Sequence, residues 1–332
     1  MVDIALIGAG RWGKNLVRTF HNIGGSRLRW LVDLDEEALG AISSCYPGLK
    51  TTTQLTEALA DPKVEALVIA TPASTHYALA LEALALGKHL FVEKPLATST
   101  QEAKAIYEGA EEAGCMLMVG HVFLHNPAVK AIKEALEKEH LGALHYISMT
   151  RTNDGPIRQD VSVAWDLASH DISMMLHWLE SDPIEVSARG AEWTRVSAHG
   201  EAAHKADTLF ATLTFPKDVL VHLHVSWLTP GKVREVTLVG DKGLISFDDT
   251  NNAAPLRTQT RASSEARAAA LEEWAPLLSS DSPLEIQCRH FVKELDEGRY
   301  MQGDALFATR VIRVIEAIEA SMASKGAPVR LS

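Results

Sequence analysis

The sequence predicts an α/β protein with an N-terminal doubly wound parallel sheet and a C-terminal α+β domain that contains an open, mainly antiparallel sheet. Up to about residue 120, short apolar segments alternate with helix-like segments, which is typical of a parallel sheet. A glycine-rich turn follows the first apolar segment. After residue 121, strand-like segments follow one another with few helices between them. We therefore expect two domains, 1–121 and 122–332.

The first strand and the turn after it have the spacing of a dinucleotide-binding site. An apolar strand is followed by G-x-G-x-x-G at Gly8, Gly10 and Gly13. The first glycine permits a tight turn, the second lets the backbone approach a pyrophosphate, and the third lets the helix pack closely on the strand. The helix N-terminus presents free N–H groups to phosphates. We expect a Rossmann domain in which these glycines, together with Arg11 and Trp12, bind the cofactor.

The second predicted strand ends at Asp33, 20 residues beyond Gly13. A carboxylate at this distance accepts hydrogen bonds from the adenine ribose hydroxyls and repels a 2′-phosphate. Leu34 and Asp35 provide no cation for such a phosphate, although Arg11 could reach the region. The sequence therefore favours NAD over NADP.

Ligands of parallel sheets bind beyond the carboxyl ends of the strands. The polar and turn residues at the later strand ends are therefore candidates for the cofactor site: Thr71, Pro72, His76, Glu93, Lys94 and His121. Lys94 is also a candidate for catalysis, because it stands between a strand end and Pro95 and its backbone is restricted by the proline. An alternative is a solvated loop lysine paired with Glu93.

The C-terminal half is predicted to contain a helix from Pro127 to about Glu139, two closing helices, and six strands: 144–150, 184–188, 209–215, 219–227, 235–239 and 243–247. A further helix is expected over Ser264 to Glu273. His222 and His224 project from one face of their strand. With no third ligand in view we assign no metal, and favour a polar sheet face or a subunit contact.

One predicted helix runs from Trp165 to about Leu179. Asp166 and His170 are four residues apart on it, hence on one helical face. A carboxylate beside an imidazole fixes its tautomer and stabilises its protonated form, which suits a general base for an alcohol proton. A purely structural pair is the alternative, but a dinucleotide site also requires a proton acceptor. Asp171 could instead pair with a basic side chain.

The overall composition limits the classes of partner. The chain of 332 residues has a net charge of −11, which argues against a broad nucleic-acid surface. Its three cysteines are widely spaced and fit a reducing compartment. No stretch reaches the ~20 apolar residues needed to span a membrane, and the N-terminus reads as a strand rather than a signal peptide. We expect a cytoplasmic protein without membrane or nucleic-acid partners.

Taken together, these motifs resemble the Gfo/Idh/MocA oxidoreductases, the family of glucose–fructose oxidoreductase and inositol dehydrogenase. The resemblance rests on the glycine turn and on segments 70–76, 87–89, 93–96, 165–171 and 303–305, and it extends over nearly the whole chain. Segments 120–127 and 158–161 resemble a branch that includes proteins similar to UDP-N-acetylglucosamine 3-dehydrogenase. The segment Val161 to Ala164 lacks the glycine run of many members, which speaks against an inositol-type substrate.

The resemblance implies a homodimer or homotetramer formed through the free face of the C-terminal sheet, and a sugar, cyclitol or nucleotide sugar as substrate. Lys94 is implied to contact the substrate hydroxyl and the cofactor, His170 to act as acid/base, and Asp166 to be its companion. The residues implied on the nicotinamide side are Thr71, Pro72, Glu93 and His121.

We therefore expect an NAD(P)-dependent oxidoreductase that transfers hydride between nicotinamide and a sugar hydroxyl or ketone, with a nucleotide sugar as the leading substrate. Arg151, Asn153 and Arg158 are candidates to hold this substrate, or else are surface polar residues. The alternatives are a free sugar or inositol dehydrogenase, a reductase of an imine or tetrapyrrole, and a non-catalytic dinucleotide-binding sensor or scaffold.

Overall fold

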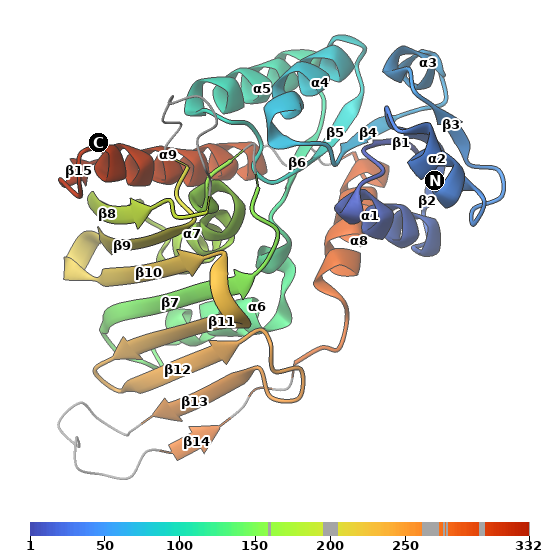
Figure 1. Ribbon diagram of the computed structural model, residues 1–332. Helices are drawn as coiled ribbons and strands as arrows, with labels where there is room; N and C mark the ends of the chain where they lie inside the picture. The colour runs from blue at the N-terminus through green and yellow to red at the C-terminus, as the bar shows by residue number, and fades with distance from the viewer. Residues whose placement is uncertain are drawn as a thin grey trace. The chain divides into compact units, whose positions relative to one another are not determined.

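A computed structural model describes residues 1–158, 161–194, 205–260, 272–274, 276, 278–298 and 303–331 (Figure 1). The chain divides into two compact units, one of Met1–His125 and Asp281–Ile312, the other of Asn126–Ser280 and Arg313–Ser332. The first unit thus includes helix α8 (Pro283–Asp296) and the beginning of α9 (Gly303–Ala323), which lie far beyond the boundary predicted after residue 121.

The first unit contains the predicted parallel sheet. Its six strands have the order β3-β2-β1-β4-β5-β6, and all neighbouring strands are parallel. The strands are β1 (Val2–Ile7), β2 (Ser26–Val32), β3 (Lys50–Thr52), β4 (Ala66–Ile69), β5 (His89–Glu93) and β6 (Leu117–Gly120). The helices that follow them are α1 (Arg11–Asn22), α2 (Glu36–Ser43), α3 (Leu55–Ala60), α4 (Ala73–Ala85) and α5 (Thr100–Ala113). This confirms the doubly wound fold.

Local signals explain where these helices begin and end. Ser99 caps α5 by accepting a hydrogen bond from the Glu102 N–H (3.1 Å), and Gly114 ends it in the left-handed conformation. One side of α1 is buried with Phe20 against the sheet. Phe20, Phe91 and Phe291 contact one another edge to face, with ring centroids 5.4–6.2 Å apart. Helix α8 therefore contributes to the core of the first unit.

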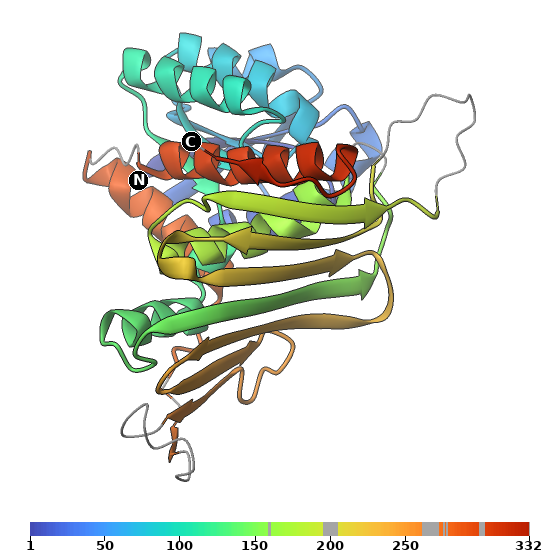
Figure 2. The same cartoon turned by 90° about the vertical axis from the view of Figure 1, so that its left-hand side faces the viewer.

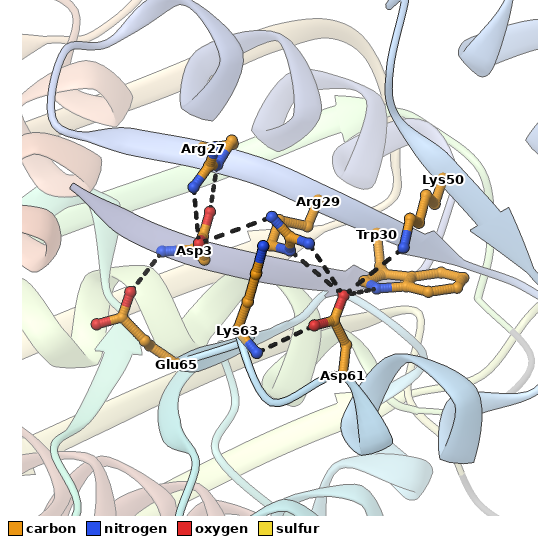
Figure 3. A network of polar contacts seen from close by, with 8 residues as sticks. All are labelled: Asp3, Arg27, Arg29, Trp30, Lys50, Asp61, Lys63 and Glu65. Carbon is orange, nitrogen blue, oxygen red and sulfur yellow. Dashed lines mark hydrogen bonds and ion pairs between the residues drawn. The ribbon is translucent and has the colours of Figure 1, made fainter.

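A network of polar side chains joins the early parts of β1, β2 and β3 (Figure 3). Asp61 accepts from the Trp30 indole N–H (3.0 Å) and from Arg29 (3.2 Å), while Arg27 donates to Asp3 through two nitrogens. The hydrogen bonds from the Trp30 indole, the Lys63 N–H and Arg29 hold the pKa of Asp61 well below its usual range. The network stabilises the sheet away from the carboxyl ends of its strands.

The second unit is built on a nine-stranded sheet of order β14-β13-β12-β11-β7-β10-β9-β8-β15 (Figure 2). The strands are β7 (Leu144–Asp154), β8 (Glu185–Ala191), β9 (Thr208–Thr214), β10 (Leu220–Ser226), β11 (Leu228–Gly240), β12 (Gly243–Asp248), β13 (Leu256–Thr260), β14 (Glu272–Trp274) and β15 (Val329–Arg330). Among the described strands of this second sheet, only β7 and β10 pair in parallel. The prediction of an open, mainly antiparallel sheet is confirmed.

Most of the helix predicted over Ser264 to Glu273 lies outside the described residues. Its last two positions, Glu272 and Glu273, belong to β14 rather than to a helix. Strand β13 pairs with them in antiparallel fashion.

One face of this sheet packs on helices and the other is open. Helix α6 (Pro127–Glu137) packs on α7 (Ser169–Leu179), where the Trp178 indole N–H donates to the Val129 carbonyl (3.0 Å). The C-terminal part of α9 is tied to β8 by the Ala188 N–H, which donates to the Ser321 hydroxyl (2.8 Å). Figure 2 views the opposite face, which no described helix of this unit covers. Among the described helices, none combines the length and apolar character that a membrane span requires.

Candidate active site

Each of the three positions in the first turn is occupied by glycine for a different structural reason. Gly8 has a φ of +107°, and a Cβ there would lie 2.5 Å from the Ala70 carbonyl oxygen. A Cβ on Gly13 would overlap the Gly8 carbonyl oxygen. A Cβ on Gly10 would meet no described protein atom within 4 Å. The fold therefore explains Gly8 and Gly13, whereas Gly10 leaves open space for a group outside the chain, as a bound pyrophosphate requires.

Helix α1 begins directly at this open space. Gly10 is its N-cap, no side chain caps it, and its first turn contains no acidic residue. Its first N–H groups are therefore free of side-chain acceptors, and the positive end of the helix dipole points toward the space beside Gly10. Both features suit the phosphates of a dinucleotide.

Asp33 lies against the same turn. Its carboxylate accepts a hydrogen bond from the Ala9 N–H and another from the Asp35 N–H (2.9 Å). The next side chain, Leu34, is 89% exposed and adds no positive charge. This places an acceptor beside the phosphate-binding turn, where the adenine ribose of NAD would lie.

Glu93 connects the glycine turn to the end of β5. The Trp12 indole N–H donates to one of its oxygens, and the Lys94 N–H donates to the other (3.3 Å). Burial raises the pKa of Glu93 to about 7, against the lowering effects of the Trp12 hydrogen bond and the Lys94 charge. Gly120 is its neighbour on β6, where a Cβ would lie 2.7 Å from a Glu93 oxygen. The main chain of Lys94 is therefore connected through Glu93 to Trp12 in the cofactor-binding turn.

His76 is fully buried between two turns at this edge of the sheet. Its Nδ1 lies 2.8 Å from the Pro95 carbonyl oxygen and its Nε2 lies 3.0 Å from the Thr71 carbonyl oxygen. The Lys94–Pro95 peptide bond is cis. Both ring nitrogens thus contact main-chain carbonyls, and direct contact of His76 with the cofactor stays a prediction.

Thr71 and Pro72 form the turn between β4 and α4. Pro72 is the N-cap residue of α4, and the Thr75 hydroxyl donates to its carbonyl oxygen (2.7 Å). The hydroxyls of Thr71 and Thr75 lie 2.7 Å apart. Since the Thr75 proton is used on Pro72, Thr71 is the donor in this pair.

His121 follows β6 and is 4% exposed. Neither of its ring nitrogens has a hydrogen-bond partner in the described part of the chain. Burial, and secondarily the Lys94 charge, lower its pKa to about 3, so the ring is neutral. The Phe307 ring contacts it edge to face at 5.7 Å. A buried neutral imidazole without a protein partner is available to a bound ligand.

In the second unit, Asp166 and His170 lie on a distorted helix. Residues Ala164–Ala168 form a π-helical turn that leads into α7, so the segment predicted as one regular helix begins with a wider turn. Such turns occur frequently at functional sites. The Asp166 carboxylate accepts a hydrogen bond from the Trp227 indole N–H (3.1 Å), and the Ser173 hydroxyl donates to the His170 carbonyl (2.7 Å).

The predicted alternative for Asp171, pairing with a basic side chain, is what the structure shows. Arg151 donates to it through Nε (2.7 Å) and Nη2 (3.0 Å), and both side chains are buried. Arg151 is thus engaged in an internal ion pair, and its role in holding the substrate stays a prediction. Asn153, also on β7, has a buried Oδ1 without a partner among the described residues. Arg158 is half-buried in the extended segment after β7.

Comparison with known proteins agrees with this geometry. A family model described as "Oxidoreductase family, NAD-binding Rossmann fold" matches residues 2–121, and one described as "GFO/IDH/MocA C-terminal domain" matches residues 129–246. The chain belongs to the GFO/IDH/MocA oxidoreductase family. It is an NAD-binding oxidoreductase, and the predicted resemblance is confirmed.

Several relatives of this family are similar in sequence. UDP-N-acetylglucosamine 3-dehydrogenase of Acidithiobacillus ferrooxidans is 29% identical over 191 residues, which are 57% of either chain. The scyllo-inositol 2-dehydrogenase (NAD(+)) of Bacillus subtilis is 31% identical over 208 residues, 60% of this chain and 57% of that one. The matched segments thus span little more than half the length of these two relatives.

Two solved structures match almost the whole chain. GenD2 from gentamicin A biosynthesis, in complex with NAD, is 26% identical with a TM-score of 0.84, covering 100% of this chain and 96% of its own. A putative oxidoreductase from Magnetospirillum magnetotacticum MS-1 is 30% identical with a TM-score of 0.79, covering 95% and 98%.

Two features of the GFO/IDH/MocA site were missed from the sequence. Trp227, the donor to Asp166, comes directly after β10, and the parallel pairing of β10 with β7 was not predicted. The hydrogen bond between Trp12 and Glu93 joins residues 81 positions apart. The sequence signal for the first contact was a tryptophan at the end of the predicted strand 219–227.

The His222 and His224 side chains are on the open face of the sheet. The His224 ring stacks on Phe210 with centroids 4.3 Å apart, and burial lowers its pKa. The described residues contain no group of three or more His, Cys, Asp or Glu side chains arranged for a metal ion.

Proposed function

We propose that this oxidoreductase oxidises a secondary hydroxyl group of a sugar and reduces the matching ketone in the reverse direction, with a nucleotide sugar as substrate. NAD, when bound, accepts or returns the hydride. The observation that carries the proposal is the link from the glycine turn through Trp12 and Glu93 to Lys94. This link supports a position for Lys94 near the nicotinamide end of the cofactor site.

In this proposal three side chains act on the hydroxyl group. His170 takes its proton as the general base, with Asp166 as the companion that orients it and stabilises the imidazolium. Lys94 holds the same oxygen and stabilises its developing negative charge. Lys94 belongs to the first unit, while Asp166 and His170 belong to the second. The proposal therefore assigns the cofactor to the first unit and the substrate to the second.

The substrate side is supported by a polar group on β7. Asn153 offers a buried carbonyl oxygen without a described partner, and we propose that it accepts a substrate hydroxyl, with Arg158 as the candidate for an anionic group. The name of the Acidithiobacillus ferrooxidans relative supports a nucleotide sugar.

The test is a substrate screen with purified protein. UDP-sugars, free sugars and inositols are offered with NAD, and formation of NADH is followed by absorbance. Turnover with a UDP-sugar well above that with free sugars supports the proposal. Turnover with free sugars alone contradicts the nucleotide-sugar assignment.

A second candidate is an inositol or free sugar dehydrogenase. Its support is the name of the Bacillus subtilis relative, a scyllo-inositol 2-dehydrogenase, which is 31% identical to this chain against 29% for the nucleotide-sugar relative. The same screen decides between them. A non-catalytic NAD sensor would bind NAD and show no turnover with any compound of the panel.

We further propose that the open face of the second sheet forms a homodimer or homotetramer contact. Tyr146, Phe210 and Leu220 are each nearly half exposed on it, on the adjacent strands β7, β9 and β10, and exposed apolar patches mark contact surfaces. Light scattering after size exclusion should give a multiple of 36.1 kDa. Phe210→Asp with Leu220→Asp should reduce this mass; a wild-type monomer contradicts the proposal.

The three cysteines are free thiols, which supports the proposal of a cytoplasmic, reducing location. Fractionation of the source cells, with the protein detected by antibody, tests this location.

A further inference from the structure

We propose that His76 carries a proton on both ring nitrogens. As an imidazolium, it connects the turn at Thr71 with the turn at Lys94 and Pro95. It is a positioning residue for Lys94, not a cofactor ligand. The role of Lys94 rests on the proposed function, whereas the protonation state of His76 does not.

The argument starts from the two contacts of the ring. Nδ1 lies 2.8 Å from the Pro95 carbonyl oxygen, and Nε2 lies 3.0 Å from the Thr71 carbonyl oxygen. Both distances are those of good N–H···O hydrogen bonds. A carbonyl oxygen only accepts, and a neutral imidazole has only one N–H to donate. Both contacts are hydrogen bonds only when both nitrogens are protonated.

A neutral ring would be costly in this place. One nitrogen lone pair would then face a carbonyl oxygen at about the same distance, so two acceptors would oppose each other inside the protein. His76 is 1% exposed, so water has little access to relieve this. Two oriented carbonyl dipoles stabilise the charged form instead. The ionisable groups at the end of β5, next to Pro95, are Glu93 and Lys94.

The two carbonyls belong to neighbouring strand ends. Thr71 follows β4 and Pro95 follows β5, and these strands pair in parallel up to Ile69 and Val92. The described pairing of β4 with β5 ends at Ile69 and Val92, before Thr71 and Pro95. The His76 side chain, projecting from α4, continues the connection past the end of the sheet. It thereby holds the main chain at Pro95, directly after Lys94, to the turn at Thr71.

Nitrogen-15 NMR of the full-length protein tests the protonation state. The protein is labelled in its histidine rings and recorded at pH 7 without substrate, and the His76 signals are assigned by their loss in His76→Gln. We expect both ring nitrogens of His76 to show attached protons. A single protonated nitrogen overturns the proposal, whether or not the enzyme turns over a sugar. Failure of the substrate screen, by contrast, leaves this spectrum unchanged.

Kinetics test the positioning role. Because a misplacement near 1 Å can cost about 10²-fold in rate, His76→Gln should lower kcat by about 10- to 100-fold. The dissociation constant for NADH should stay within about threefold. His21→Gln, an exposed histidine of the same unit, serves as the control and should change neither. A variant that keeps its kcat but loses NADH affinity overturns the proposal, since that pattern indicates direct contact with the cofactor. A melting temperature close to wild type establishes that the variant is folded.

Discussion

The guanidinium group of Arg151 donates two hydrogen bonds to the carboxylate of Asp171, and both side chains are buried, with 4% and 2% of their surface exposed. Arg151 is on β7 and Asp171 is on α7. The pair therefore ties the helix that carries His170 to the sheet beneath it. Asp171 is one residue beyond His170, so the pair lies next to the residue proposed as the general base.

Removing one partner should destabilise the protein strongly. In Arg151→Met the Asp171 carboxylate remains buried without its counter-ion, and we expect a loss of about 3–5 kcal/mol in the free energy of unfolding. The exposed pair of Arg330 and Glu185 provides the control, since Arg330→Met should cost at most about 1 kcal/mol. Urea unfolding measures both. Adding Asp171→Leu to Arg151→Met should restore much of the loss; equal, small effects of both arginine variants would contradict the argument.

The glycine turn offers a matched pair of substitutions. In Gly10→Ala the new Cβ meets no described protein atom, so the melting temperature should be near wild type, while NADH binding should weaken by about tenfold or more (~1.4 kcal/mol). In Gly13→Ala the Cβ overlaps the Gly8 carbonyl, so the fold itself should lose stability. Calorimetry and fluorescence titration with NADH separate these effects. Unchanged NADH affinity in Gly10→Ala would refute the assigned position of the pyrophosphate.

Glu93 should make stability depend on pH. Its pKa is raised from 4.5 to about 7 in the folded protein, so between these values the native state holds a proton that the unfolded state releases. Stability from this group is complete below pH 4.5 and is lost as pH rises through 7, by up to about 3 kcal/mol. We expect Glu93→Gln to match wild type near pH 4.5 and to exceed it at pH 8. Urea unfolding at the two pH values tests this; a variant that gains nothing at pH 8 contradicts it.

His170 should control the chemical step. We expect His170→Ala to lower kcat by about 10²–10⁴-fold, the usual scale for the loss of a general base. Its NADH affinity should remain, because cofactor binding is assigned to the first unit. The exposed His145 on β7 provides the control variant, His145→Ala. Full activity of His170→Ala on the substrate found in the screen would exclude His170 as the base.

Asp33 should set the choice between the two nicotinamide cofactors. In Asp33→Ser the charge that repels a 2′-phosphate is gone, so the ratio of NADPH to NADH dissociation constants should fall by about tenfold or more. Fluorescence titration with each cofactor measures the ratio. Tighter binding of NADPH than NADH to the unaltered protein would contradict the role assigned to Asp33.

Much of the fold and part of the site followed from local sequence patterns. The alternation of apolar strands and helices, the spacing of Gly8, Gly10 and Gly13, and the position of Asp33 act over a few residues or one βαβ unit. The cap at Ser99 and the end of α5 at Gly114 depend on backbone geometry of the same short range. Such features can be read without knowing which distant segments meet.

Contacts between distant residues were decided only by the tertiary structure. The sequence by itself determined the fold class and the residue types at the strand ends, because hydrophobic period and turn chemistry are local. The packing of the chain decided that Asp171 pairs with Arg151, that His76 lies between the carbonyls of Thr71 and Pro95, and that the Asp166 segment winds as a π-turn. These arrangements satisfy buried charges and hydrogen bonds, and the partners that satisfy them come from other strands and helices.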